Sequence, residues 1–198
     1  MSCNLPASNL DDITYLQSGT PRQRDAFAAL DSLRVMDILR AYSPILAGTI
    51  PLDIDIASSD LDILCHVHDF PAFESRIVDT FGHLPSFQIK QKSVNDLPSV
   101  IAKFTHAGFL VEIFGQARPV ARQNGYRHLV VEARLLALGG AAARDAIREL
   151  KRAGLKTEPA FARYFNLAGD PYQTLLVLSE LSETELKKTL RRYEPSQG

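Results

Sequence analysis

The chain has 198 residues, of which 45% are hydrophobic and 23% are charged, and it carries a formal net charge of −1. These values are typical of a globular protein with one sizeable core, and they argue against extensive disorder. No apolar run approaches the roughly 20 residues that a membrane span needs, and the first residues lack the layout of a secretion signal. The two cysteines, Cys3 and Cys65, do not indicate a disulfide framework. We therefore expect a reduced, cytoplasmic protein.

Charge is unevenly distributed along the chain. Residues 1–116 contain 8 Lys and Arg against 14 Asp and Glu, whereas residues 117–198 contain 14 against 9. An acidic half beside a basic half is suited to a divalent cation and a phosphate-bearing ligand that lie between them. The alternative is that the C-terminal helices simply carry solvated Lys and Arg faces.

The N-terminal part predicts one helix and then two short strands. Thr20 is a good N-cap, and Gln23 completes a capping box before an apolar pattern with helical spacing, so we expect a helix over about 20–41. Segment 45–49, ILAGT, has the pattern of a short buried strand that opens into a turn. Segment 60–67, DLDILCHV, predicts a second strand after a Ser-Ser break.

The following segments complete a sheet, and the remainder of the chain is helical. Segment 69–82 predicts a helix with apolar residues along one side. Three antiparallel strands are expected at 87–93, 99–106 and 108–115, and from Pro119 onward the pattern is helical. The predicted fold class is α+β, a mixed sheet of about five strands with flanking helices followed by an α-helical lobe. We divide the chain into a flexible N-terminal segment, an α/β core and a C-terminal helical region packed on the core, at 1–18, 19–116 and 117–194.

Two aspartates interrupt the strand predicted at 60–67. Alternate side chains of a strand share a face, so Asp60 and Asp62 project together while Leu61 and Ile63 point into the opposite layer. An ionised carboxylate among apolar residues is costly unless it is paired or bound to a metal. Paired carboxylate oxygens select hard cations such as Mg²⁺ or Mn²⁺. We therefore predict a metal site on the two aspartates, and the alternative is a turn cap with one exposed acid.

A third acid and a glycine-containing turn can complete such a site. Glu112 lies alone among apolar neighbours in a predicted central strand, and a third carboxylate would complete a two-metal clamp. An ion pair of Glu112 with Lys103 or Arg134 is the alternative. Gly48 and Thr49 can bring backbone N–H groups and a hydroxyl close to a phosphate.

Together these elements resemble the nucleotidyltransferase superfamily typified by DNA polymerase beta. The shared pattern is a buried strand that ends in Gly48-Thr49, a spacer of ten residues, Asp60-Leu61-Asp62 in a strand, and then Glu112 in a later strand. The longer text GTIPLDIDIASSDLDI, with EIFGQ, YRHLVVEARLL and GLKTEPAFA, is similar to a bacterial domain-of-unknown-function family of nucleotidyltransferase-like proteins. This similarity extends over about residues 15–178, and the superfamily motif over about 44–115.

The resemblance implies a nucleotidyltransferase-like sheet, with metal ions on Asp60 and Asp62 and with Glu112 as the acid that helps to deprotonate the attacking hydroxyl. A nucleoside monophosphate would pass from an NTP to an acceptor hydroxyl, and pyrophosphate would leave. Mg²⁺ or Mn²⁺ would be the cofactor. Two features depart from the pattern: the spacer has no basic residue, and Asp53 and Asp55 would repel a phosphate unless they face away.

The segment after the last predicted strand offers cationic and aromatic side chains. Arg122 and Tyr126 are four residues apart and share a face of a predicted helix, and Arg127 follows them. These three residues can grip a triphosphate and stack a base, whereas a solvated helix front is the alternative. Lys151 and Lys156 are further candidates for the phosphate role.

The predicted function is that of a Mg²⁺-dependent nucleotidyltransferase acting on a small molecule, a protein or an RNA end. The chain lacks a long basic stripe with interleaved aromatic residues, so extended nucleic-acid binding is not expected. Two alternatives remain. One is a nucleotide- or metal-binding regulatory module of the same fold without turnover. The other is a metal-dependent phosphohydrolase that uses the same acids with water as the nucleophile.

Overall fold

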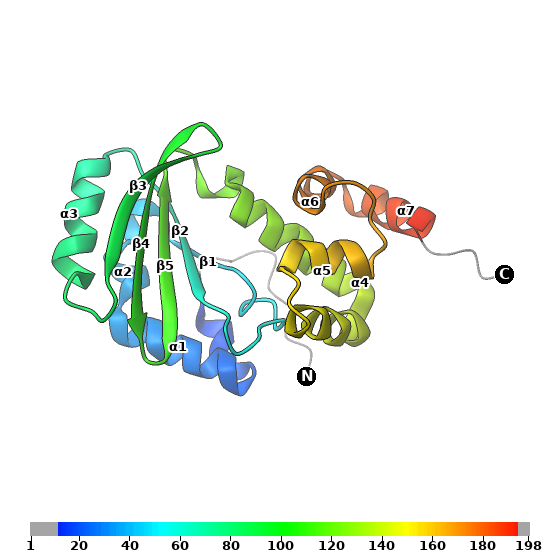
Figure 1. The fold of residues 1–198 in the computed structure, drawn as a ribbon, viewed down its shortest axis with the longest axis horizontal. Helices are drawn as coiled ribbons and strands as arrows, with labels where there is room; N and C mark the ends of the chain where they lie inside the picture. The colour runs from blue at the N-terminus through cyan, green and yellow to red at the C-terminus, as the bar shows by residue number, and fades with distance from the viewer. Residues whose placement is uncertain (1–11, 194–198) are drawn as a thin grey trace.

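The computed structural model describes residues 12–193 and shows a mixed five-stranded sheet flanked by helices (Figure 1). The strands lie in the order β1-β2-β5-β4-β3. Their bounds are β1 Ile45–Ala47, β2 Leu61–His66, β3 Gln88–Val94, β4 Leu97–His106 and β5 Phe109–Gln116. β5 pairs parallel to β2, and the other neighbouring strands pair antiparallel. The predicted α+β fold class is confirmed, including the three successive antiparallel strands.

Helices precede the sheet, connect two of its strands and then form the C-terminal region. The first group is η1 Thr14–Ser18, α1 Pro21–Leu33, α2 Val35–Ile38, η2 Arg40–Tyr42 and, between β2 and β3, α3 Phe70–Phe81. The second group is η3 Val120–Arg122, α4 Asn124–Arg152, α5 Thr157–Tyr164, α6 Pro171–Ser179 and α7 Glu183–Tyr193. Within residues 12–193, no helix has the length and apolar character required to cross a membrane.

The first helix starts where the sequence predicts but ends earlier. Thr20 and Gln23 form the expected capping box at the start of α1. The predicted helix over 20–41 is interrupted at Arg34, which has a φ of 51° in the left-handed region. An L-residue in that conformation cannot continue a right-handed helix. The chain therefore continues as the short helices α2 and η2.

The N-terminal segment that was predicted to be flexible is partly ordered. Residues 1–11 lie outside the described residues. The segment that follows forms η1, in which Leu16 is fully buried, and Ile13 beside it is also buried. Both side chains belong to the core beneath α1.

Two hydrophobic cores lie on opposite faces of the sheet. On one face, η1, α1, α2 and α3 pack against side chains of β2, β4 and β5, and these include Leu61, Ile63 and Cys65. On the other face, the C-terminal helices pack against the β1–β2 edge, where Leu64 is buried. The predicted alternation of β2 is thus confirmed, because its odd-numbered residues enter one core and Asp62 faces the other side of the sheet.

Gly140 divides α4 into two helical runs. Its φ of 65° and ψ of −154° lie in a region that glycine enters readily and residues with a Cβ avoid. The second run brings the end of α4 back to the loop between β1 and β2. There Arg148 contacts Asp53, and Lys151 donates a hydrogen bond to the carbonyl of Ile54.

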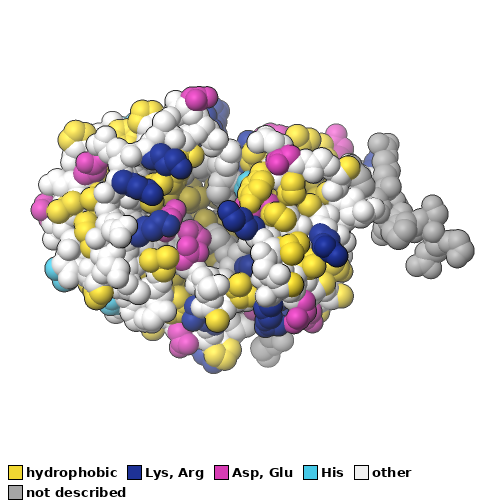
Figure 2. Space-filling model, in the orientation of Figure 1, with side chains coloured by type: hydrophobic (Ala, Val, Ile, Leu, Met, Phe, Trp, Pro, Cys, Tyr) yellow, Lys and Arg dark blue, Asp and Glu magenta, His cyan; other side chains and the backbone are white. Residues whose placement is uncertain are grey.

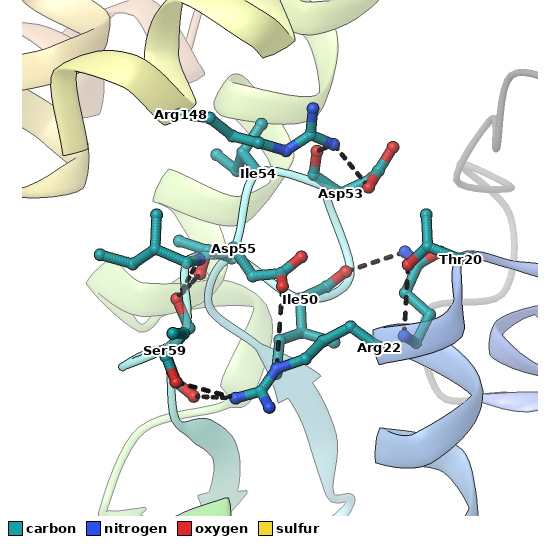
Figure 3. A network of polar contacts seen from close by, with 12 residues as sticks. Thr20, Arg22, Ile50, Asp53, Ile54, Asp55, Ser59 and Arg148 are labelled. Carbon is teal, nitrogen blue, oxygen red and sulfur yellow. Dashed lines mark hydrogen bonds and ion pairs between the residues drawn. The ribbon is translucent and has the colours of Figure 1, made fainter. Parts of the chain in front are cut away.

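The β1–β2 loop, residues 48–60, lies between α1 and α4 (Figure 3). Ile50 is buried in the core beneath α1, whereas Ile54 is buried in the core of the C-terminal helices. Gln23 Nε2 of α1 donates to the carbonyl oxygen of Ile50 at 2.9 Å, and Lys151 Nζ of α4 donates to that of Ile54 at 2.9 Å. The loop therefore connects the two cores through both apolar packing and buried hydrogen bonds.

The two aspartates of the loop face arginines of these helices (Figure 3). Asp53 Oδ1 is 2.6 Å from Nη2 of Arg148. Asp55 Oδ2 is 3.9 Å from Nε of Arg22, and Nη2 of the same arginine donates to the carbonyl of Ser59 at 3.3 Å. Burial raises the pKa of Asp55, and the nearby Asp53 carboxylate acts in the same direction. The negative charge of the loop is thus partly balanced within the loop's own surroundings.

Ile54→Ala tests whether the loop depends on its buried apolar residues. Ile54 is fully buried, so truncation removes apolar burial and leaves a cavity. We expect the free energy of unfolding to fall by about 2–5 kcal/mol in a denaturant titration followed by circular dichroism. Val177→Ala is the control, because Val177 is 64% exposed on α6, and it should change stability by less than about 0.5 kcal/mol. Equal stability of the two variants would show that the loop is not anchored.

Candidate active site

A cavity of about 480 Å³ lies between the sheet and the C-terminal helices. Figure 2 shows a hollow between the two halves of the molecule, with acidic and basic side chains beside it. The lining on the sheet side includes Gly48, Thr49, Asp60, Asp62 and Glu112. The lining on the helical side includes His128, Glu132, Lys151 and Glu158. A cavity of this size falls in the range of small-molecule sites.

The three predicted acids come together on the sheet wall. Asp62 of β2 and Glu112 of β5 are direct register partners in the parallel pair. Neighbouring strands lie about 4.8 Å apart, so the two side chains are adjacent although fifty residues separate them in the sequence. Asp60 lies one residue before β2 and lines the same cavity. The register therefore places Asp62 and Glu112 side by side, and Asp60 lines the same cavity.

Asp62 is the most strongly perturbed of these acids. Burial, and then the charges of Asp60 and Glu112, raise the pKa of Asp62 to about 7. Among the described residues, no side chain donates a hydrogen bond to its carboxylate or forms an ion pair with it. The carboxylate of Asp62, a half-buried residue, thus offers two oxygen donors without a direct protein partner within residues 12–193.

Glu112 has a partner of its own. Lys103 of β4 is its register partner on the other side, and Lys103 Nζ donates directly to the Glu112 carboxylate. This hydrogen bond, with the charges of Glu112, Asp60 and Asp62, raises the pKa of Lys103. Of the two ion pairs considered from the sequence, the structure contains the one with Lys103, whereas Arg134 donates to a backbone carbonyl of the α6–α7 connection.

The expected cluster of three metal ligands is not preformed. Within the described part of the chain, no group of three or more His, Cys, Asp or Glu side chains is arranged to hold a metal ion. In the same part of the sheet, the ammonium of Lys103 binds the carboxylate of Glu112. Asp60 and Asp62 keep their carboxylate oxygens available to the cavity. A role for these acids in metal binding stays a prediction.

The turn after β1 brings backbone close to Asp62. Gly48 has a φ of +78°, and a Cβ added to it would lie only 2.4 Å from Asp62 Oδ2. Thr49 lines the cavity, but its hydroxyl donates within the loop, to Ser59 Oγ at 3.0 Å. Asp53 and Asp55 are not among the lining residues, so these two acids face away from the cavity.

The helical wall carries a second polar group. His128 Nδ1 is 3.3 Å from Glu158 Oε1, and its Nε2 is 3.1 Å from the carbonyl oxygen of Tyr172. Burial, and then the charge of Glu158, raise the pKa of Glu132 well above its ordinary value. Burial lowers the pKa of Lys151 to about 8, although nearby acids, which include Asp55 and Glu132, act in the opposite direction. The amine is therefore largely protonated near pH 7. Lys151 therefore adds a cation opposite the three acids.

Several of these residues were not predicted as site residues from the sequence. The sequence motif does not point to Glu132, Glu158 or His128 as residues that line the cavity. A signal for Glu132 does exist in the sequence, because it interrupts the apolar side of a helix between Leu129 and Leu136, four residues after His128. Lys156, the second lysine considered for phosphate binding, does not line the cavity.

Arg122, Tyr126 and Arg127 lie outside this cavity, which corrects the expectation that they serve the same site. They line a separate hollow between η3, the start of α4 and the end of α6. Arg127 Nη2 is 2.6 Å from Glu180 Oε1 and donates to the carbonyl of Leu176 at 2.8 Å. These contacts direct the guanidinium of Arg127 toward α6, so Arg127 links α4 to α6.

Comparisons with known proteins identify the family of the chain and its fold. A family model described as "Domain of unknown function (DUF4269)" matches residues 28–178. The chain belongs to this family. No curated protein sequence matches the DUF4269 chain.

Solved structures show the fold to which the DUF4269 chain is similar. A structure of Cid1, described by its RNA terminal uridylyl transferase activity, has a TM-score of 0.52 and 14% identity. The alignment covers 80% of the DUF4269 chain and 49% of the Cid1 chain. A structure of the Cid1 poly(U) polymerase with MgGTP bound has a TM-score of 0.51 and 14% identity. The alignment covers 86% of the DUF4269 chain and 55% of the Cid1 chain. The DUF4269 chain thus spans about half the length of these proteins. The similarity shows that its fold is nucleotidyltransferase-like.

Gly48→Ala tests the close approach of the loop to Asp62. The substitution places a methyl group on a left-handed residue and against Asp62 Oδ2. Gly108→Ala is the matched control, because Gly108 has a φ of +80° but an added Cβ would meet nothing within 4 Å. We expect Gly48→Ala to lower the free energy of unfolding by about 1–3 kcal/mol more than Gly108→Ala does. If denaturant titrations show the same loss of stability for both variants, the close approach of Gly48 to Asp62 is contradicted.

Asp62→Asn tests the burial of a titrating carboxyl. The folded-state pKa of Asp62, about 7, lies above the ordinary value of 3.8, so between these pH values the folded state binds more protons than the unfolded state. Its contribution to the free energy of unfolding therefore falls as the pH rises from about 4 to about 7. We expect Asp62→Asn to be about 1–3 kcal/mol more stable than the wild type at pH 8 and equal to it near pH 4.

The measurement for Asp62→Asn is thermal or denaturant unfolding at both pH values in buffer with a chelator. Asp25→Asn, on the exposed side of α1, is the control and should differ little from the wild type at either pH. A stability difference for Asp62→Asn that does not change with pH would show that Asp62 is not the group that titrates.

Proposed function

We propose that this DUF4269 protein is a nucleotidyltransferase that moves a nucleoside monophosphate from an NTP to an acceptor hydroxyl. The observation that carries the proposal is the meeting of Asp60, Asp62 and Glu112 on the wall of a cavity that also holds the Gly48 turn and Lys151. The nucleotidyltransferase-like fold supports it, and one similar structure was solved with MgGTP bound. A cavity of about 480 Å³ has room for a ligand of nucleotide size.

The residues present fit a magnesium ion at Asp60 and Asp62. Carboxylate oxygens are the donors that this hard cation prefers. The Asp62 carboxylate has no direct partner among the described residues. Burial raises its pKa, and so do the charges of Asp60 and Glu112, which a cation would offset. When bound there, Mg²⁺ or Mn²⁺ would neutralise the charge that develops on the transferred phosphate.

The chain's own residues supply positioning and proton transfer. Gly48 leaves space beside Asp62 because it has no Cβ, and Lys151 presents a positive charge to the phosphates from the opposite wall. The acceptor oxygen forms a bond to the α-phosphorus while the bond from that phosphorus to the bridging oxygen of the β-phosphate breaks, and pyrophosphate leaves with the electron pair. Glu112 accepts the hydroxyl proton and passes it to solvent.

The loop charges do not oppose phosphate binding as strongly as the sequence implied. Asp53 and Asp55 would repel an anionic ligand if they faced the cavity. Instead, they face Arg148 and Arg22, outside the lining. The basic residue that the spacer lacks is supplied from α4, in the form of Lys151.

A nucleotide-binding module without turnover is the second candidate function. The observation that favours it is the ion pair between Lys103 and Glu112, because it occupies the third acid. Both candidates predict nucleotide binding in the cavity, and they differ only in whether a product forms.

Turnover is tested with purified protein, Mg²⁺ or Mn²⁺, and each α-labelled NTP, together with pools of small molecules, proteins and short RNAs as acceptors. We expect labelled acceptor and pyrophosphate to form, and we expect Asp62→Asn to lower the rate at least about a hundredfold because the carboxylate that fits the cation is lost. Asp25→Asn serves as the control and should retain the wild-type rate. Nucleotide binding by calorimetry without product from any pool would instead identify the binding module.

Two further outcomes of this assay would contradict transfer to an acceptor. Breakdown of nucleotide in the absence of every acceptor would identify a phosphohydrolase. Turnover that is unchanged in Asp62→Asn would show that the activity does not use this site.

A further inference from the structure

A row of three charged residues crosses the sheet at the end of the cavity. Asp62, Glu112 and Lys103 lie directly opposite one another on the adjacent strands β2, β5 and β4. Register partners project from the same face of a sheet, so the three side chains stand side by side. Lys103 Nζ is bound to the Glu112 carboxylate.

Lys103 acts electrostatically on the whole group of acids. Its ammonium interacts with Asp60 and Asp62 in addition to its hydrogen bond with Glu112. Glu112 lines the cavity, and the side chains of Lys103 and Glu112 are 37% and 23% exposed, so an ion from solvent can reach the pair.

We propose that Lys103 takes the place of a second divalent cation, so that the site binds one such ion, at Asp60 and Asp62. The inference rests on the proposed function, because it takes these acids to be a cation site. A two-metal site needs carboxylates that are shared between ions about 3.5–4 Å apart. In this chain, the third carboxylate that could complete a two-metal site, that of Glu112, is held by an ammonium group.

Charge balance supports a single ion. On the sheet wall, three carboxylates and one ammonium group leave a charge of −2 when all are ionised, and Lys151 across the cavity offsets part of it, so one divalent cation is enough to neutralise the group. Without the ammonium group, the charge of −3 would favour either tighter binding of the first ion or the entry of a second. A second ion at Glu112 would also have to displace Lys103 or approach a like charge at close range, which is unfavourable.

Titration with Mn²⁺ alone tests this inference, because electron paramagnetic resonance measures the free ion and requires no turnover. We expect the wild type to bind one Mn²⁺ ion that Asp62→Asn fails to bind. Lys103→Met keeps most of the side-chain length and removes the charge, so it should bind a second Mn²⁺ ion or bind the first at least about tenfold more tightly. Lys103→Arg keeps the charge and should behave as the wild type.

Lys90→Met is the matched control. Lys90 is an exposed lysine of β3 that lies opposite Ile101 rather than opposite an acid, so its removal should leave Mn²⁺ binding unchanged. Lys103→Gln is a second neutral variant in case the methionine variant does not fold, and thermal unfolding checks all of the proteins. Ions that Asp62→Asn still binds are adventitious and are subtracted.

The outcomes separate the two proposals. The same number and affinity of Mn²⁺ ions in the wild type, Lys103→Met and Lys103→Gln would overturn the role of Lys103 while leaving the site intact. Two Asp62-dependent ions in the wild type would overturn it as well. If neither the wild type nor any variant binds Mn²⁺, the acids are not a cation site, and the metal-dependent function fails together with this inference.

Discussion

The carboxylate of Asp62 is held on a cavity wall by a strand whose opposite face is committed to the core. β2 buries Leu61 and Ile63 completely beneath α1 and α3, and the alternation of a strand then turns Asp62 to the other side. The rise in the pKa of Asp62 from 3.8 to about 7 corresponds to a cost on the order of 1–3 kcal/mol when the group is ionised. Burial of two large apolar side chains contributes about 3–6 kcal/mol, so the strand can keep this orientation.

The rest of the cavity depends on the β1–β2 loop, which links both cores. Ile50 enters one core and Ile54 the other. The buried hydrogen bond from Lys151 to Ile54 also fixes the position of a lysine that faces the acids. That contact requires α4 to turn back at Gly140. The C-terminal helices are therefore part of the candidate site, because the cavity has no second wall without them.

Much of the fold could be predicted because its signals are local. The alternation in β2 and the Thr20 capping box depend only on neighbouring residues, and the motif of glycine, paired aspartates and a later glutamate identified the sheet wall. The break at Arg34 could not be predicted, because an arginine gives no sign of a left-handed conformation.

Other features depend on which segments meet in space. The choice between Lys103 and Arg134 as the partner of Glu112 needed the register of β4 on β5, which sequence alternation does not determine. Likewise, Arg127 is equally plausible from the sequence as a phosphate ligand or as a tie between helices, and only the position of Glu180 on the neighbouring segment decides between them.

The cost of ionising Asp62 favours a functional role for the cavity. Asp62 destabilises the folded state when it ionises, and Gly48 leaves room beside its carboxylate because it has no Cβ. A chain that needed only to fold would be more stable with an uncharged residue at position 62. Unpaired charge in a desolvated position persists mainly where a ligand or a reaction requires it. The acids face a cavity with a lysine on its far wall, so the ligand that best relieves this cost is a cation together with the phosphates it carries.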